Sequence, residues 1–448
     1  MPNKHKVKQT AILTIDKLVF GGEAIGRLDG KVCFVWNALP GEEVEVELTS
    51  KKKTHNNGIA TKIIKPSPDR IPACEDHYLS CSPWSIMTSA AEQKWKKKIA
   101  LEAYIGIGKL PPETDLDIVD ASDCNGNNAY GYRNKIEYSF WHHDADNRIS
   151  LAFFQRGKHF RAPIETCLLA EPCINQTAEL IIQWLNNHAI NRGALKSLII
   201  RSNGQGDTIA ALFMREEIPF ASYPKLGALP LTGTQSPSQF CGFQVYFSNP
   251  LSPAALPTKL LYSAGDDYLI TKLNDVSLKF GSLSFFQINV PVFQQALALI
   301  KEYLDPSKEI VDFYSGVGAI SLPLHSNFKH AVLVDNNEEA IEYAKQNITA
   351  NQITNCKAVL SESEKIVDLI KHDKIIIFDP PRAGLHADVV AKVLQELPER
   401  IIYLSCNIST QARDIQLLSD AYKVSHLKLY NFFPRTPHIE SLGVLERK

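Results

Sequence analysis

The sequence lacks the features that mark membrane and secreted proteins. No apolar run is long enough to cross a membrane, and residues 1–10 lack the apolar core of a secretory signal. The nine cysteines are an odd number at irregular spacing, which does not suit a disulfide framework. We therefore expect a cytoplasmic protein with reduced thiols and no membrane partner.

The chain also lacks a strong net charge, because 48 basic residues nearly balance 49 acidic ones. A formal charge of −1 does not by itself suggest a nucleic-acid partner. Residues 1–70 are the exception, with twelve Lys or Arg against eight Asp or Glu. The basic runs Lys51–Lys53 and Lys94–Lys98 can either bind phosphate or form solvated faces. A chain of 448 residues should hold about three domains.

Short strand patterns separated by turn residues fill residues 7–66. The expected strands are 11–18, 24–28, 31–35, 43–48 and 58–64. Asp29-Gly30 is a hairpin signal, and residues 43–48 alternate with a period of two. Because closure removes exposed sheet edges, this run of short strands favours a small closed β-barrel over residues 1–66.

A proline-rich linker at residues 66–72 leads into a region of mixed pattern. Helices are expected at 89–105, with Ser89 as the cap, and at 171–186. Strand patterns occur at 134–141, 149–155, 195–202 and 207–214, and loops and short strands fill 219–253. We predict a central α+β domain with an antiparallel sheet over residues 67–277.

From about residue 278 strands alternate with helices, which indicates a parallel sheet. Strands are expected at 310–314, 331–334, 375–378 and 401–404, and helices at 338–351 and 387–397. The predicted fold class is therefore α/β, with a Rossmann-like doubly wound domain over residues 278–448 behind the barrel and the central domain.

The first strand of this domain runs into a glycine turn at Gly316 and Gly318. Such a turn lets the backbone approach a ligand closely, although a packing turn would look the same. Asp335 ends the next strand, 23 residues after Asp312. A carboxylate there can accept the ribose hydroxyls of an adenosine-containing cofactor. Together these residues favour S-adenosylmethionine over NAD.

Two further strand ends carry candidate groups. Asp379 precedes two prolines that stiffen its loop, which serves either a site or a rigid turn. Similar segments occur in methyltransferases that act on exocyclic amines. Cys406 follows the strand at 401–404, where a helix begins, and a helix amino terminus favours a thiolate. The alternative for Cys406 is a buried core thiol.

The order and separation of several segments resemble the RNA uracil-5-methyltransferase family, which uses S-adenosylmethionine. These segments are Ser284–Asn289, Asp312–Gly318, Asp379–Gly384, Ser405–Asn407 and Phe433–Ser441. Residues 7–66 also resemble the TRAM domain, a small RNA-binding barrel, at residues 21–22, 26–30, 34–35, 39–42 and 51–53. The resemblance implies methylation of carbon 5 of a uridine in structured RNA, with ribosomal RNA preferred to transfer RNA. We expect a monomer.

The resemblance also implies roles for individual residues. Cys406 matches the nucleophile that adds to carbon 6, and Glu440 matches the base that removes the carbon 5 proton. The cofactor and uracil pocket is matched by Gln287, Tyr314, Gly316, Asp335 and Asp379. Ala319 stands where the family has an asparagine, and Phe285 or Phe286 could stack on a base or belong to the core. A non-catalytic RNA-binding protein is the alternative from another class.

Many members of this family hold a [4Fe-4S] cluster with four cysteines. Cys74, Cys81 and Cys167 occupy matching positions, but Trp84 stands at the third close position and the first gap has one extra residue. Because a cluster takes four thiolates, we expect no [4Fe-4S] cluster and no other metal, with packing around Trp84 in its place.

Overall fold

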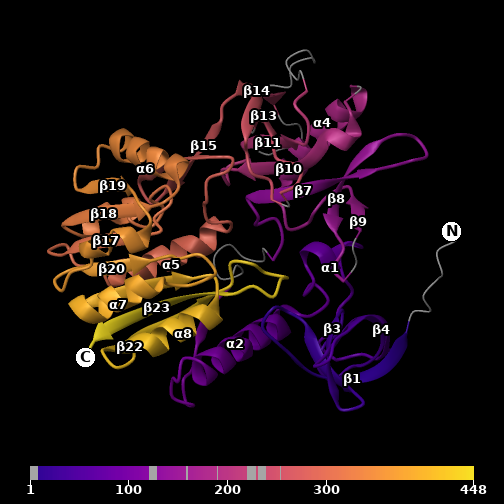
Figure 1. Ribbon diagram of the computed structural model, residues 1–448, viewed down its shortest axis with the longest axis horizontal. Coiled ribbons are helices and arrows are strands. Elements are labelled where there is room, and N and C mark those ends of the chain that lie inside the picture. Colours follow the sequence, from indigo (N-terminus) through magenta and orange to yellow (C-terminus); the bar gives the residue numbers. More distant parts are fainter. Residues whose placement is uncertain are drawn as a thin grey trace.

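The computed structural model describes residues 9–120, 129–157, 160–188, 190–218, 229–230, 239–252 and 254–448. Residues 1–8, and most of the stretch 219–253 expected to form loops and short strands, lie outside the described residues. The chain forms a barrel, a central sheet and a C-terminal layered domain (Figure 1). Among the described helices, none combines the length and the apolar character needed to span a membrane.

The N-terminal part is a closed barrel, as predicted. Its strands are β1 (Thr10–Leu18), β2 (Ala24–Leu28), β3 (Lys31–Trp36), β4 (Glu43–Lys51) and β5 (Asn56–Lys65), in the spatial order β1-β2-β3-β5-β4. Alternate side chains point inward, so that Val44 and Val46 are fully buried between more exposed neighbours. Glu42, also fully buried, binds Arg70 of the linker at 2.5 Å. The linker is thereby fixed to the barrel.

The central part is a mixed sheet covered on one face by helix α4 (Pro172–Asn187). Its strands are β7 (Lys135–His142), β8 (Ile149–Phe154), β9 (Arg161–Ile164), β10 (Leu195–Ser202), β11 (Thr208–Met214), β12 (Leu229–Pro230), β13 (Gln239–Phe247) and β14 (Lys259–Gly265). The order is β12-β13-β11-β10-β7-β8-β9, with β14 paired to β13. The strands are antiparallel as predicted, except that β11 and β13 are parallel. The short helices are α1 (Tyr78–Cys81) and η1 (Arg192–Ala194).

The hairpin of β15 (Tyr268–Leu273) and β16 (Val276–Gly281) leads into the C-terminal domain. The parallel strands there are β17 (Glu309–Phe313), β18 (His330–Asp335), β19 (Cys356–Leu360), β20 (Ile375–Phe378) and β21 (Arg400–Ser405). The order β19-β18-β17-β20-β21 continues through β23 (Glu440–Arg447), β22 (Tyr422–Tyr430) and β6 (Asp117–Val119). The predicted doubly wound sheet is thus confirmed, and β23 adds to it antiparallel to β21.

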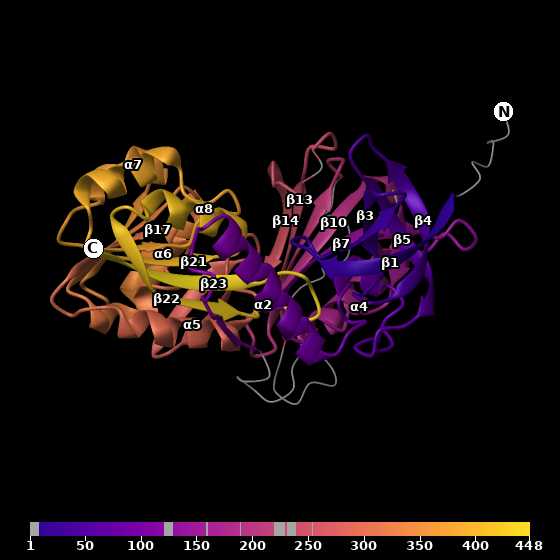
Figure 2. The same ribbon diagram turned by 90° about the horizontal axis from the view of Figure 1, so that it is seen from below.

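Helices cover both faces of this sheet (Figures 1 and 2). One core layer contains α5 (Val290–Glu302), α6 (Glu338–Ala350) and η3 (Leu322–Asn327). The opposite layer contains α7 (Ala387–Glu396), α8 (Ile408–Leu418) and the turns η4 (Ser363–Lys365) and η5 (Val367–Leu369). Apolar side chains of the buried strands alternate between the two layers, as parallel strands covered on both sides require.

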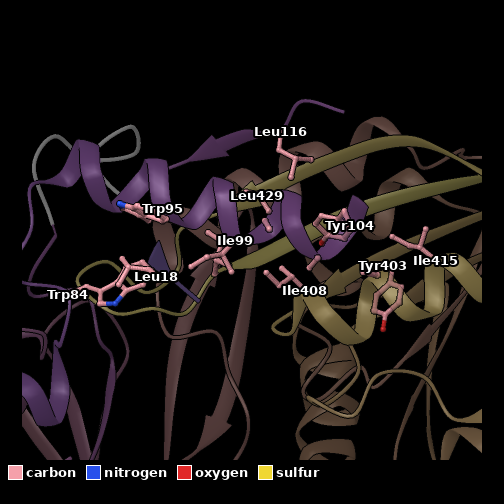
Figure 3. Close-up of a cluster of buried hydrophobic side chains, with 14 of the residues drawn as sticks. Leu18, Trp84, Trp95, Ile99, Tyr104, Leu116, Tyr403, Ile408, Ile415 and Leu429 are labelled. Carbon is pink, nitrogen blue, oxygen red and sulfur yellow. The ribbon is translucent and has the colours of Figure 1, made fainter. Parts of the chain in front are cut away.

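Helix α2 (Ser89–Gly106) differs from its predicted setting. It begins one residue after its cap, Thr88, whose hydroxyl accepts a hydrogen bond from the Ala91 N–H at 3.3 Å. The helix packs on α8 of the C-terminal domain, and β6 pairs with β22 (Figures 2 and 3). Its apolar residues Trp95, Ile99 and Tyr104 face the cluster that contains Ile408 and Leu429. The predicted central domain over residues 67–277 stays a prediction. Within it, α2 and β6 make their contacts with the C-terminal domain.

Candidate active site

The candidate nucleophile and the candidate base lie at the same edge of the C-terminal sheet. Strand β21 ends at Ser405, directly opposite Ser441 of the antiparallel strand β23. Cys406 and Glu440 are the next residues outward on the two strands, so the register itself brings them together. Glu440 is only 5% exposed and Cys406 is partly buried. A thiol and a carboxyl group thus share one partly closed edge, as the resemblance implied.

Asp379 joins them from the neighbouring strand. It follows β20, whose Phe378 lies opposite Tyr403 of β21. The Gln287 side-chain amide donates a hydrogen bond to Asp379 Oδ2 at 3.2 Å. Gln287 is buried, and its backbone carbonyl accepts a hydrogen bond from the Asn134 side chain at 2.8 Å. The central domain therefore helps to hold the residue that orients Asp379.

A hydrogen-bond bridge connects the loop of Asp379 to the loop of Cys406. The Asn407 side-chain oxygen accepts hydrogen bonds from the N–H groups of Ser409 and Thr410 and so caps α8. Its amide nitrogen donates to the Arg382 carbonyl at 2.9 Å, and the Thr410 hydroxyl donates to the same oxygen at 3.2 Å. Sequence reasoning did not identify this bridge, because its partners are far apart in the chain.

The expected cofactor residues line the adjacent strand ends. Asp335 Oδ2 accepts a hydrogen bond from the Gly316 N–H at 2.9 Å, and its Oδ1 accepts one from the Asn337 N–H at 2.8 Å. A side chain at Gly316 would meet no atom closer than 3.9 Å, so the space before it is open to a ligand. A side chain at Gly318 would collide with Leu322 at 2.6 Å, which makes that glycine a packing residue.

A narrow pocket brings together Gln287, Tyr314, Gly316 and Asp379, but Asp335, Cys406 and Glu440 do not line it. It is lined by Phe285, Phe286, Gln287, Phe293, Tyr314, Ser315, Gly316, Val317, Ala319, Ile320 and Asp379. Phe286 is 2% exposed and stacks on Phe280 with ring centroids 4.4 Å apart, so it is a core residue. Phe285 is 64% exposed and stays available to a substrate. Larger hollows of about 970 and 450 Å³ lie on the central domain and contain none of the catalytic or cofactor candidates.

The electrostatics of the edge raise the pKa values of its acidic groups. Burial raises the pKa of Glu440 to about 8, although Arg382 opposes the shift. Burial and the neighbouring Glu440 raise the pKa of Asp379 well above its usual value. Burial, Glu440 and Asp379 raise the pKa of the Cys406 thiol to about 11, and Arg382 lowers it only in part. The expectation that the helix terminus yields a thiolate is therefore wrong here, because two carboxyl groups and burial outweigh it.

A buried polar network holds the segment that leads to Glu440. Lys96, fully buried on α2, donates to Glu92 at 2.8 Å, to the Asn431 side chain at 2.5 Å and to the Phe433 carbonyl at 3.0 Å. The Arg435 N–H donates to Glu92 at 3.0 Å. Sequence reasoning missed these residues. The sequence signal that could have identified them is an acidic residue and a lysine four residues apart on one predicted helix, among apolar neighbours.

The cysteines of the possible cluster site do not converge in the way that a [4Fe-4S] cluster needs. The thiols of Cys81 and Cys167 lie together with Glu75 and His77, their ligand atoms within 4.8 Å of one another. Cys74 is exposed, and its sulfur accepts a hydrogen bond from the Tyr130 hydroxyl at 3.5 Å. Trp84 is 2% exposed and donates to the Gly22 carbonyl of the barrel at 3.1 Å. The residues present do not fit a four-thiolate cluster.

Comparisons with known proteins show a likeness to RNA methyltransferases. Residues 264–448 match the family model tRNA (Uracil-5-)-methyltransferase. A protein of Fusobacterium nucleatum subsp. nucleatum, described as an uncharacterized RNA methyltransferase, is 29% identical over 461 residues, covering 99% of this chain and 97% of that protein. One of Thermosynechococcus vestitus, described in the same words, is 27% identical over 453 residues, covering 97% and 98%.

A solved structure shares the whole fold. It is the Pyrococcus abyssi tRNA (uracil-54, C5)-methyltransferase in complex with S-adenosyl-L-homocysteine, with a TM-score of 0.75 and 22% identity over 98% of this chain and 100% of that one. The family model covers the segment that carries Asp379, Cys406 and Glu440, and the relatives cover nearly all of the rest. This chain is therefore similar to the tRNA (Uracil-5-)-methyltransferase family model over residues 264–448, and to proteins described as RNA methyltransferases over nearly its whole length.

Proposed function

We propose that the protein transfers a methyl group from S-adenosylmethionine to carbon 5 of a uridine in structured RNA, through a covalent adduct between Cys406 and carbon 6. The register of β21 and β23, which sets Ser405 opposite Ser441, carries the proposal. This register brings a thiol and a carboxyl group together from different strands. Asp379, which follows the neighbouring strand β20, supplies a third group.

The residues at the neighbouring strand ends fit the cofactor. S-adenosylmethionine, when bound, would supply an electrophilic methyl group. Asp335 is oriented by two backbone N–H groups and keeps lone pairs that can accept ribose hydroxyls. The open space in front of Gly316 allows the close backbone approach that such a ligand needs.

The chain's own residues then account for the bond changes at uracil. Cys406 releases its proton to solvent water and its sulfur bonds to carbon 6, which moves the carbon 5–carbon 6 π electrons towards the carbon 4 oxygen. Asp379, whose protonated form is favoured by its raised pKa, can donate a hydrogen bond to the enolate oxygen. After carbon 5 has taken the methyl group, the Glu440 carboxylate removes its proton. The double bond re-forms, the carbon 6–sulfur bond breaks and the Cys406 thiolate leaves.

A mechanism-based probe tests this proposal. RNA that contains 5-fluorouridine has no removable proton on carbon 5, so the methylated adduct should persist and migrate with the protein on a denaturing gel. Cys406→Ala should form no adduct, whereas Cys356→Ala, which removes a partly buried thiol on β19, should form it normally. The proposal fails if the wild type forms no adduct, or if Cys406→Ala forms as much as the wild type.

The RNA class is a separate part of the proposal. We propose ribosomal RNA as the substrate, with transfer RNA as the second candidate because the matched family model carries transfer RNA in its name. Mass mapping of 5-methyluridine in both RNA classes, from cells with and without this protein, decides between them. Loss of the modified base from transfer RNA alone would contradict the ribosomal assignment.

We further propose that the barrel contributes RNA affinity. Lys51, Lys52 and Lys53 are all exposed at the end of β4, where they can reach phosphates. Changing the three lysines to glutamine should weaken RNA binding and reduce its salt dependence, with a slope lower by about 0.9 for each duplex phosphate that a lysine no longer neutralises. An unchanged salt slope would mean that the RNA does not bind to these three lysines.

A further inference from the structure

We propose that Glu75, His77, Cys81 and Cys167 form a mononuclear zinc site in the central domain. The four side chains each offer one ligand atom, and these atoms lie within 4.8 Å of one another. Glu75, His77 and Cys81 come from the segment around α1, and Cys167 comes from the connection between β9 and α4. The site is separate from the edge that carries Cys406.

The measured separations fit a tetrahedral ion. Around a zinc ion with Zn–S near 2.3 Å and Zn–N or Zn–O near 2.0 Å, neighbouring ligand atoms lie roughly 3.3 to 3.8 Å apart. His77 Nε2 is 3.3 Å from Glu75 Oε1, and the Cys81 sulfur is 3.6 Å from Glu75 Oε2. The ligand atoms of the remaining pairs lie within 4.8 Å of one another, so these pairs need to close by about 1.5 Å at most, which side-chain rotation can supply.

One of the four ligand atoms also lacks a hydrogen-bond partner among the described residues. His77 Nε2 is buried and makes no hydrogen bond to any described residue, although it lies in ion-pair range of Glu75. A buried ring nitrogen without a hydrogen bond costs free energy unless something binds it. Coordination to zinc would satisfy this nitrogen.

The surrounding groups hold the ligands in place. The Leu168 N–H donates to Glu75 Oε1 at 2.6 Å. The Asn175 side chain binds the backbone of Cys167 twice, accepting from its N–H at 3.0 Å and donating to its carbonyl at 3.1 Å. Ser82 lies 3.4 Å from the Cys81 sulfur and can donate to it. Outer contacts of this kind orient metal ligands and are a usual part of such sites.

The donor set selects the type of ion. Two thiolates favour zinc over magnesium or calcium, and one imidazole suits zinc equally well. With two thiolates instead of four, the site cannot hold an iron–sulfur cluster in the usual way. Hollows of about 450 and 260 Å³ reach the site from two sides and give a hydrated ion a path to it. The bound ion would fasten residues 75–81 to the connection between β9 and α4.

Metal analysis of the full-length protein tests the site. The wild type, purified with reductant and without chelators, should contain about one zinc per chain. The double variant Cys81→Ser/Cys167→Ser should contain almost no zinc. The control variants Cys74→Ser and Cys173→Ser should contain as much zinc as the wild type, because Cys74 is exposed and the Cys173 thiol donates a hydrogen bond to Ser202 instead. A chelator should lower the melting temperature of the wild type and leave that of the double variant unchanged.

His77→Ala provides a second test of the site in case the double variant does not fold. It should keep a native circular dichroism spectrum but yield zinc to a competing chelator about tenfold more readily than the wild type. The proposal is overturned if the wild type takes up no zinc after reconstitution, or if it contains iron and sulfide at cluster levels. Zinc loss in Cys74→Ser, or a Cys81–Cys167 disulfide in protein kept with reductant, would overturn it as well.

Discussion

The side chain of Asn407 donates a hydrogen bond to the backbone carbonyl of Arg382 at 2.9 Å. The residue after the candidate nucleophile thus holds the loop that carries Asp379. The same side chain caps α8 with its oxygen. Asn407 therefore fixes the distance between two loops that must act on one base.

Changing Asn407 should separate its two roles. Asn407→Ala removes both, so it should cost about 1 kcal/mol of stability because the cap is missing, and it should lower kcat more than it changes KM. Asn407→Asp keeps the capping oxygen but cannot donate to Arg382, so its kcat should fall while most of the stability returns. Steady-state kinetics and urea unfolding measure both effects. Thr88→Ala, which removes the cap of α2, should lose similar stability with a smaller loss of kcat.

The raised thiol pKa of Cys406 predicts slow alkylation of the free protein. Because the thiolate fraction grows tenfold per pH unit up to about 11, the rate of iodoacetamide modification at Cys406 should still be rising at pH 9. An ordinary cysteine would level off near a pKa of about 8.5. Peptide mass mapping of a Cys74→Ser variant measures the alkylation of Cys406 separately from that of the other cysteines.

Two charge changes should move this alkylation rate in opposite directions. Glu440→Gln removes a carboxyl group that raises the Cys406 pKa, so the rate at pH 8 should increase. Arg382→Gln removes the cation that lowers it, so the rate should decrease. If both variants react alike, these groups do not set the thiol pKa.

Glu440→Gln should trap the methylated adduct on ordinary RNA. A glutamine cannot remove the carbon 5 proton, so a covalent complex should accumulate without fluorine in the substrate. In the wild type the carboxylate form of Glu440 grows up to a pKa of about 8. The rate of adduct breakdown should therefore rise with pH and level off above about 8. Gel shifts in single-turnover reactions at several pH values measure both outcomes.

The same group predicts a pH dependence of stability. Folding raises the pKa of Glu440 from 4.5 to about 8, so its stabilising contribution is complete below pH 4.5 and is lost as pH rises towards 8. Glu440→Gln should thus melt at a higher temperature than the wild type at pH 8, and the difference should shrink towards pH 5. A constant difference across this range would contradict the raised pKa.

Lys96 should be essential to the packing of α2 against the C-terminal segment. Lys96→Met leaves Glu92 buried without its closest cation, which should cost about 3–5 kcal/mol. The exposed Lys94→Met on the same helix should stay within about 0.5 kcal/mol of the wild type. Urea unfolding compares the two. A cost below about 1 kcal/mol for Lys96→Met would mean that the network is not needed for stability.

Local sequence patterns predicted much of the fold. The barrel strands and β17, β18, β20 and β21 could be placed within a few residues, because turn glycines and apolar runs act over short distances. The order of the C-terminal sheet could not be placed in this way. The position of β23 beside β21 depends on pairing between residues 36 apart, Ser405 and Ser441, which no local pattern encodes.

The predicted site was incomplete for the same reason. Burial and two carboxyl groups from distant strands decide the Cys406 pKa, and the helix start visible in the sequence does not. Cysteine spacing alone does not indicate Glu75 and His77, although both lie close to Cys74 in the sequence and close in space to Cys81 and Cys167. Helix α2 was grouped with its neighbours in the chain, but its partners Asn431 and Arg435 lie more than 300 residues later.

Trp84 connects the barrel to the C-terminal domain through buried contacts. Its indole N–H donates to the Gly22 carbonyl at 3.1 Å, and its backbone N–H donates to the Arg435 carbonyl at 3.1 Å. A side chain at Gly22 would meet Pro437 at 2.5 Å, so the barrel lies against the segment leading to Glu440. Cleavage of the linker at residues 66–72 should leave a nicked protein that elutes as one species. A chain shortened to residues 67–448 would expose Trp84 to water, so deleting the barrel would impair solubility.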